Sequence, residues 1–208
     1  REIVALYREH LSWLPRPFVD GTLSPQVYVW GIVVAWGSMF VLQIAALIAV
    51  RRTGAVNPAP WAIGPVIASL LFLLYPPTST DIFAYASFGW VADEGANPYV
   101  VPPDSLRGDP YAAFNDWTMV RTPYGPLWTG ISRGIVHFSN HDPFATALGF
   151  KIFTALCAFG LAVLAYHLAR RFTDDRHKAL IAFVLVCWSP ILLTEAAATV
   201  HLDPVMML

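Results

Sequence analysis

Charged residues are scarce in this chain of 208 residues. They make up 13% of it, whereas hydrophobic residues make up 56% and the mean hydropathy is +0.53. A soluble domain usually carries about a quarter charged residues. The shortage excludes an ordinary soluble globular domain and indicates an integral membrane protein.

Cysteine and net charge are also low. The two cysteines, Cys157 and Cys187, lie in apolar runs, which is typical of buried free thiols and not of a disulfide framework or a metal site. The net charge of −1 offers no attraction for nucleic acid. A glycine-rich phosphate loop is missing from the sequence as well. The sequence therefore predicts no nucleic-acid partner and no metal site at the cysteines; a divalent metal elsewhere is not expected but is left open.

What the chain does have is long apolar stretches. A membrane-spanning helix needs about 20 mostly apolar residues, and we predict spans at 27–50, 61–77, 144–169 and 179–194, with a fifth beginning near 196. Pro190 is expected to kink the fourth span near its end. The chain starts at Arg1 and stops inside an apolar stretch, so we expect residues 1–208 to be one transmembrane domain cut from a longer protein. The predicted fold class is an all-α, polytopic membrane protein.

Basic residues predict which way the spans face, because short loops rich in Lys and Arg stay on the cytoplasmic side. Arg51 and Arg52 follow the first span, and four basic residues follow the third, between positions 170 and 178. Both connections are predicted to lie inside, which places the intervening segment 78–143 outside. The same alternation brings Glu195, His201 and Asp203 near the outer end of the fourth span.

The outer segment 78–143 is far longer than an ordinary connector, and its many aromatic residues argue against disorder. Apolar residues recur at helical spacing from position 81 to 93, so we expect a short helix there, lying flat at the membrane surface. Gly95 is expected to end this helix in a left-handed conformation. Residues 121–128 are expected to form a turn that leads into a further apolar stretch.

Three polar positions in this segment each allow two interpretations. Asp81 is either a general base at the membrane–water boundary or half of a capping box with Thr78. Asn97 and Tyr99 are either substrate contacts or residues of a turn and of the interfacial aromatic belt.

The two cations are also open to two interpretations. Arg121 is either a phosphate ligand or a surface arginine. Lys151 lies about two turns into its span, where it either extends to the outer surface or has a functional role inside the membrane.

His201 and Asp203 resemble a metal pair only weakly, and hydrogen bonding to a polar ligand is the favoured interpretation.

Four motifs stand in the part of the chain after the second predicted span. They are Ser79-Thr80-Asp81-Ile82-Phe83-Ala84-Tyr85, Gly95-Ala96-Asn97-Pro98-Tyr99, Thr122-Pro123-Tyr124-Gly125-Pro126-Leu127-Trp128 and His201-Leu202-Asp203-Pro204. Together they resemble the GT-C membrane glycosyltransferases, and within them the bacterial polyprenol-phosphate-mannose-dependent α-mannosyltransferases. The resemblance covers about residues 71–208, and the last motif departs from the pattern at Leu202, where Asn is more usual.

The resemblance implies an activity and an architecture. The fold would be the N-terminal part of a GT-C-like transmembrane helix bundle with a helical outer loop, in a multi-pass protein of the cell membrane. The enzyme would move a sugar, mannose first among the candidates, from a polyprenyl-phosphate carrier to a hydroxyl of a glycan or glycolipid. Transfer would invert the anomeric centre and would take place at the outer face, without a cofactor. No nucleotide-sugar site is expected, and the missing phosphate loop agrees with that absence.

The resemblance also implies roles for individual residues. Asp81 matches the catalytic base, and phosphate departure calls for positive charge, for which Arg121 is the first candidate and Lys151 the second. The remaining residues would bind substrate: Tyr85, Asn97, Tyr99, Tyr124, His201 and Asp203.

Two other function classes compete with this one. A transporter or flippase for a lipid-linked or polar solute would share the spans and the intramembrane cation. It would, however, gather its polar residues near the bilayer midplane, whereas here they gather at the predicted outer boundary. A purely structural membrane subunit would leave the long aromatic outer segment without a purpose.

Overall fold

The computed structural model describes residues 2–11, 25–73 and 79–207, and these form helices and turns with no β-strand among them. They divide into two compact units. The first contains residues 1–12, 75–153 and 198–201, and the second contains residues 13–74, 154–197 and 202–208. The helix from Pro143 to Phe172 (α6) contributes its first part to one unit and the remainder to the other.

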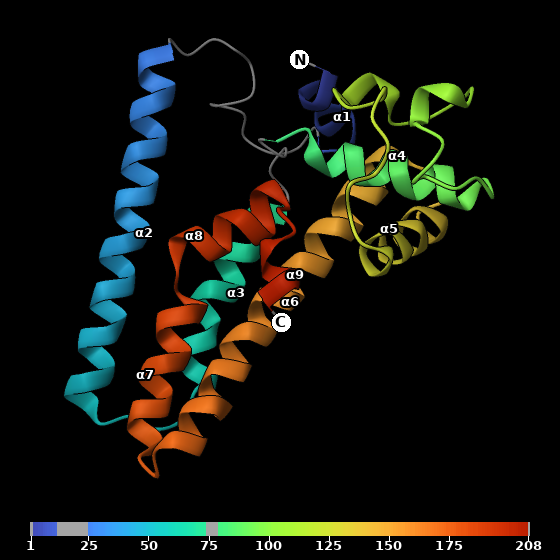
Figure 1. Ribbon diagram of the computed structural model, residues 1–208. Helices are drawn as coiled ribbons and strands as arrows, with labels where there is room; N and C mark the ends of the chain where they lie inside the picture. Colours follow the sequence, from blue (N-terminus) through green and yellow to red (C-terminus); the bar gives the residue numbers. More distant parts are fainter. Residues whose placement is uncertain (1, 12–24, 74–78, 208) are drawn as a thin grey trace. The chain divides into compact units, whose positions relative to one another are not determined.

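The second unit is a bundle of apolar helices. It contains α2 (Pro25–Thr53), α3 (Ala59–Leu73), α7 (Arg176–Cys187) and α8 (Pro190–Leu193). Helix α7 packs against both α2 and α3 (Figure 1). The hydrophobic core of the second unit includes the side chains of Val50, Ala162 and Leu180, which are fully buried. The Trp188 ring nitrogen donates a 2.7 Å hydrogen bond to the Trp61 carbonyl and so ties the end of α7 to α3.

Two described helices, α2 and α6, are long and apolar enough to cross a membrane. They coincide with the first and third predicted spans. Helix α3 has 15 described residues and measures roughly 22 Å at about 1.5 Å per residue, which is shorter than the hydrocarbon core. The predicted end of that span, at 74–77, lies outside the described residues.

The chain bends where Pro190 was predicted to kink the fourth span. Helix α7 ends at Cys187, and α8 begins at Pro190 after Ser189, whose side chain accepts the Leu192 N–H. The two helical segments meet at 48°, so together they form either a broken span or a re-entrant loop. A π-helix from Thr194 to Thr199 (η3) and the short α9 (Asp203–Met207) follow, where a fifth span was predicted to begin.

The first unit is built around two short helices, α4 (Asp81–Asp93) and α5 (Pro126–Phe138), which pack directly against each other (Figure 1). The bounds of α4 agree with the predicted helix. Its predicted end is confirmed too: Gly95 has a φ of +81°, and the Ala96 N–H donates to the Val91 carbonyl, as in a Schellman motif.

Helix α4 is an interior helix of the first unit, and its flat orientation at the membrane surface stays a prediction. Every side chain from Ile82 to Val91 is buried within the first unit. A helix that is apolar all round is an interior element, and the run of ten buried residues explains why no amphipathic face exists.

Helix α1 (Glu2–His10) was not expected, yet it belongs to the first unit. Its Tyr7 ring meets the Phe144 ring edge-on at 5.1 Å, and the His10 ring stacks on Phe144 at 4.5 Å. Residues before the first predicted span therefore fold together with the segment that follows the second one.

Candidate active site

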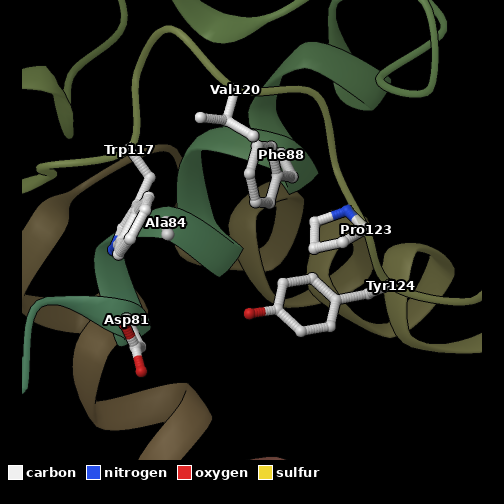
Figure 2. Close-up of a pocket in the computed structure, with 7 residues that line it drawn as sticks. All are labelled: Asp81, Ala84, Phe88, Trp117, Val120, Pro123 and Tyr124. Atoms are coloured by element: carbon white, nitrogen blue, oxygen red, sulfur yellow. The ribbon is translucent and has the colours of Figure 1, made fainter.

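A pocket of about 320 Å³ opens in the first unit beside the N-terminal end of α4 (Figure 2). In the view of Figure 2, the Trp117 ring stands on one side and Tyr124 on the other, with Asp81 at the lower edge. The wall is aromatic and aliphatic apart from one carboxyl and one phenol. The lining residues are Asp81, Ala84, Phe88, Trp117, Val120, Pro123 and Tyr124.

Helix α4 supplies one wall because Asp81, Ala84 and Phe88 follow one another at three- and four-residue spacing, which places them on the same helix face. The Asp81 N–H donates a 3.2 Å hydrogen bond to the Ser79 hydroxyl, which satisfies a donor at the start of the helix. A carboxylate in the first helical turn is also favoured by the helix dipole. The alternative partner for Asp81, Thr78, lies outside the described residues.

Short turns build the opposite wall. In four places a side-chain oxygen accepts the backbone N–H of an aromatic residue two positions later, which is the geometry of Asx and Ser/Thr turns. The third and fourth of these aromatic residues, Trp117 and Tyr124, line the pocket. The four pairs, with their distances, are Asn97–Tyr99 at 3.0 Å, Asp109–Tyr111 at 2.8 Å, Asn115–Trp117 at 2.8 Å and Thr122–Tyr124 at 3.3 Å.

Tyr124 presents a neutral hydroxyl to the pocket. Burial raises the pKa of its phenol, and the charge of Asp81 raises it further, while hydrogen bonding with Tyr85 acts in the opposite direction. The hydroxyl therefore stays protonated at neutral pH. The pocket thus combines a carboxyl group, which accepts hydrogen bonds when ionised, with a phenol that can donate one.

His201 approaches Asp81 from a distant part of the sequence. Its Nε2 lies 3.7 Å from the Asp81 carboxyl oxygen, close enough for an ion pair when the imidazole is protonated but too long for a hydrogen bond. The preceding residue, Val200, is fully buried and has a φ of +62°, a strained conformation for a β-branched residue. The structure therefore brings His201 and Asp81 together in the first unit, and their location on one face of the membrane stays a prediction.

The close approach of α4 to α5 depends on Gly89. A Cβ built at Gly89 would lie 2.6 Å from the Ser132 carbonyl carbon and 2.9 Å from the Arg133 nitrogen, both of them backbone atoms. Only glycine allows this separation. The helix that carries Asp81 is therefore seated directly on the backbone of α5.

A cluster around Asp93 holds the other end of α4. The Asp93 carboxylate accepts hydrogen bonds from Arg133 Nε and His137 Nδ1, both at 3.3 Å, and from His141 Nε2 at 2.9 Å. Burial raises the pKa of Asp93, but the hydrogen bonds from His141, His137 and Arg133 outweigh that effect, so its pKa lies below the ordinary value. The cluster ties α4 to α5 and to the turn before α6.

The structure gives three of the predicted substrate-binding residues packing or turn contacts within the first unit. Tyr85 is buried and meets the rings of Tyr124 at 5.0 Å and Trp128 at 5.2 Å. Asn97 accepts the Tyr99 N–H, and the Tyr99 hydroxyl lies 3.0 Å from the Thr129 hydroxyl. None of the three lines the pocket.

The two predicted phosphate ligands differ in exposure. Arg121 is exposed and sits between the lining residues Val120 and Pro123. Lys151 is fully buried in the first unit, with its Nζ 5.6 Å from the centre of the Tyr7 ring. Asp203 is exposed and begins α9 in the second unit, which also contains Glu195.

Five lining residues were not among the predicted site residues: Ala84, Phe88, Trp117, Val120 and Pro123. Of these, Trp117 had a usable signal. It follows Asn115 by two positions, as Tyr99 follows Asn97 within a segment that was recognised as a turn. Among the described residues, no group of three His, Cys, Asp or Glu side chains is arranged to hold a metal ion.

Comparison with known proteins extends the resemblance seen in the sequence. The profile of a family described as "Alpha-(1->6)-mannopyranosyltransferase, N-terminal domain" matches residues 4–208. Alpha-(1->6)-mannopyranosyltransferase A of Mycobacterium tuberculosis (strain ATCC 25618 / H37Rv) is 24% identical over 210 residues, which cover 95% of this chain and 37% of that protein. The chain thus spans little more than a third of the curated relative. No solved structure matches. The match over almost its whole length shows that this chain belongs to the alpha-(1->6)-mannopyranosyltransferase N-terminal-domain family.

Proposed function

We propose that the chain is the N-terminal part of a membrane mannosyltransferase that takes mannose from a polyprenyl-phosphate carrier and transfers it to a hydroxyl of a glycan or glycolipid. The observation that carries the proposal is the position of Asp81. The chain belongs to this family, and the Asp81 carboxyl lines a pocket of a size that suits a sugar. Apart from Asp81 and the Tyr124 phenol, the residues that line this pocket are apolar or aromatic.

In the proposed reaction, the Asp81 carboxylate removes the proton of the acceptor hydroxyl. The acceptor oxygen then forms a bond to C1 of mannose while the bond from C1 to the phosphate oxygen breaks, and the lipid phosphate leaves with that electron pair. Attack opposite to the leaving group inverts the anomeric centre. A nearby carboxylate is well suited to this task because proton removal in the transition state needs a positioned base.

Four further residues take proposed roles around this step. Arg121 approaches the departing phosphate, which gains negative charge and is stabilised by a guanidinium, and Lys151 is the second candidate for that role. The Tyr124 hydroxyl donates a hydrogen bond to a sugar oxygen. His201, 3.7 Å from Asp81, contacts substrate from the other side of the carboxyl. No cofactor takes part in these steps.

The outer face of the membrane is the proposed site of the reaction. Arg51 and Arg52 at the end of α2 favour a cytoplasmic location for that end. The residues before α2 then belong outside, as does the segment after α3. Residues 1–12 and 75–153 fold into one compact unit, and this shared unit supports the proposal that both lie on the same side.

The test compares Asp81→Asn with wild type in the full-length protein, reconstituted in lipid nanodiscs with radiolabelled polyprenyl-phosphate-mannose and a mannoside acceptor. Loss of a general base typically lowers the rate by about 10²–10⁴-fold. The matched control is Asp104→Asn, since Asp104 is an exposed acid of the same segment outside the pocket. It is expected to retain wild-type transfer.

Each result has one meaning. Transfer that collapses only in Asp81→Asn, at equal thermal stability, supports the enzyme class and the role of Asp81. Equal transfer by all three proteins would remove Asp81 as the base. If wild type transfers mannose from no lipid-linked donor, the mannosyltransferase proposal fails and the transporter hypothesis takes its place.

A further inference from the structure

We propose that Trp117 is the platform on which the acceptor sugar stacks, and therefore a residue that determines acceptor affinity. The inference rests on the proposed function. It adds the assignment of the pocket to the acceptor, and it gives a binding role to a side chain that the family motifs in this sequence do not include.

The wall of the pocket matches the two-sided chemistry of a pyranose ring. Such a ring has apolar C–H faces and an edge of hydroxyl groups. The negative face of an aromatic ring attracts the partly positive C–H groups, while carboxylate and phenol groups pair with hydroxyls. Trp117 and Phe88 supply aromatic surface, whereas Asp81 and Tyr124 supply the polar partners. The volume of about 320 Å³ is at the lower end of small-molecule pockets, which span about 300–1,000 Å³.

Trp117 is held in place through its backbone. Its N–H donates a 2.8 Å hydrogen bond to the Asn115 side-chain oxygen, and the Asn115 amide donates a 2.9 Å hydrogen bond to the Ser87 hydroxyl on α4. Asn115 and Ser87 are both buried. The loop that carries Trp117 is therefore anchored to the same helix that carries Asp81. An anchor of this kind pre-organises the pocket and lowers the cost of binding.

The Trp117 side chain itself is 51% exposed, although it lines the pocket. A large aromatic side chain that packing leaves half in water keeps apolar surface available for a ligand. Burial of the remaining surface under a sugar ring would release the water that now covers it, which is favourable.

The position of Asp81 indicates which sugar the pocket takes. In the proposed reaction the base must touch the acceptor hydroxyl, and it has no bond to make with the donor. A sugar in contact with both Asp81 and Trp117 is therefore the acceptor, for which an α-mannoside serves as the probe.

The kinetic test uses the full-length protein in lipid nanodiscs, with saturating polyprenyl-phosphate-mannose and varied α-(1→6)-linked mannobiose. Trp117→Ala is expected to raise the KM for mannobiose about tenfold, as loss of a tryptophan anchor typically does, and to leave the KM for the donor unchanged. Trp117→Phe keeps an aromatic face and should restore most of the affinity. Met119→Ala is the matched control, because Met119 is 79% exposed on the same loop and lies outside the pocket.

An unchanged KM for mannobiose in Trp117→Ala would overturn the inference. A rise in the donor KM alone would overturn it as well, since the pocket would then belong to the donor. If wild type gives no transfer, equilibrium dialysis of labelled mannobiose still decides. About tenfold weaker binding by Trp117→Ala supports the platform, whereas equal binding, or none to wild type, refutes it.

Discussion

The replacement of Gly89 by alanine tests whether helices α4 and α5 approach each other as closely as the structure describes. The new methyl group would lie 2.6 Å from the Ser132 carbonyl carbon, and ordinary contact begins near 3.4 Å. Helix α4 must therefore retreat by about 0.8 Å. Both neighbours of the new group are backbone atoms, so no side chain can turn away to make room.

Two effects of this change oppose each other. Alanine favours a helix over glycine by about 1 kcal/mol, while overpacking of a well-packed contact costs about 1–3 kcal/mol. Because the contact is with backbone, the upper end of that range applies, and the net loss is about 2 kcal/mol. Gly130→Ala on α5 is the matched control, because nothing lies within 4 Å of its Cβ position. It should gain about 1 kcal/mol from helix propensity alone.

Hydrogen exchange is the appropriate assay, because a membrane protein with two compact units need not unfold in one step. We expect amides of α4 and α5 in Gly89→Ala to lose about thirtyfold in protection, the equivalent of 2 kcal/mol, while those of Gly130→Ala gain protection. Equal protection in the two variants would refute the close contact. A retreat of this size should also lower transfer, since misplacement by about 1 Å can cost 10²-fold in rate.

Two further predictions concern stability in the first unit. Hydrogen bonding lowers the pKa of Asp93 below its ordinary value of 3.8, so its stabilising contribution is present above that pH and is lost as pH falls through the folded value. Acid unfolding of Asp93→Asn should depend less on pH in this range than that of wild type, and equal curves would contradict the prediction. Tyr111→Phe removes a buried 2.9 Å hydrogen bond to Thr146 and should cost about 1 kcal/mol in thermal unfolding. Burial raises the pKa of Tyr111 to about 12, so this cost should be the same at pH 6 and pH 9; a cost that changed between them would refute the assignment.

Local patterns in the sequence predicted several of the helical elements. The helix at 81–93, its end at Gly95 and the break at Pro190 each depend on residues within a few positions of one another. Helix propensity, glycine at a left-handed position and proline at a helix start act over that short range. The burial of α4 on all sides was missed because its neighbour α5 comes more than thirty residues later.

The pocket was predicted only in part, for a physical reason. Asp81 and Tyr124 stood in motifs and were found, whereas Trp117 and Val120 lie in irregular backbone that has no periodic pattern to read. Burial of Lys151 against Tyr7 joins residues more than a hundred positions apart. No rule of spacing along the chain reaches that far.

The turns that place Trp117 and Tyr124 in the pocket wall opposite α4 also affect the order in which parts of the protein fold. The turn before Trp117 and the turn before Tyr124 each join residues only two positions apart, so closing them costs little chain entropy, and structure made from sequence neighbours forms quickly. During synthesis from the N-terminus, the wall with Trp117 and Tyr124 can form as soon as its own residues have emerged. The contact between His201 and Asp81 can form only later, because His201 is synthesised after α6 and α7.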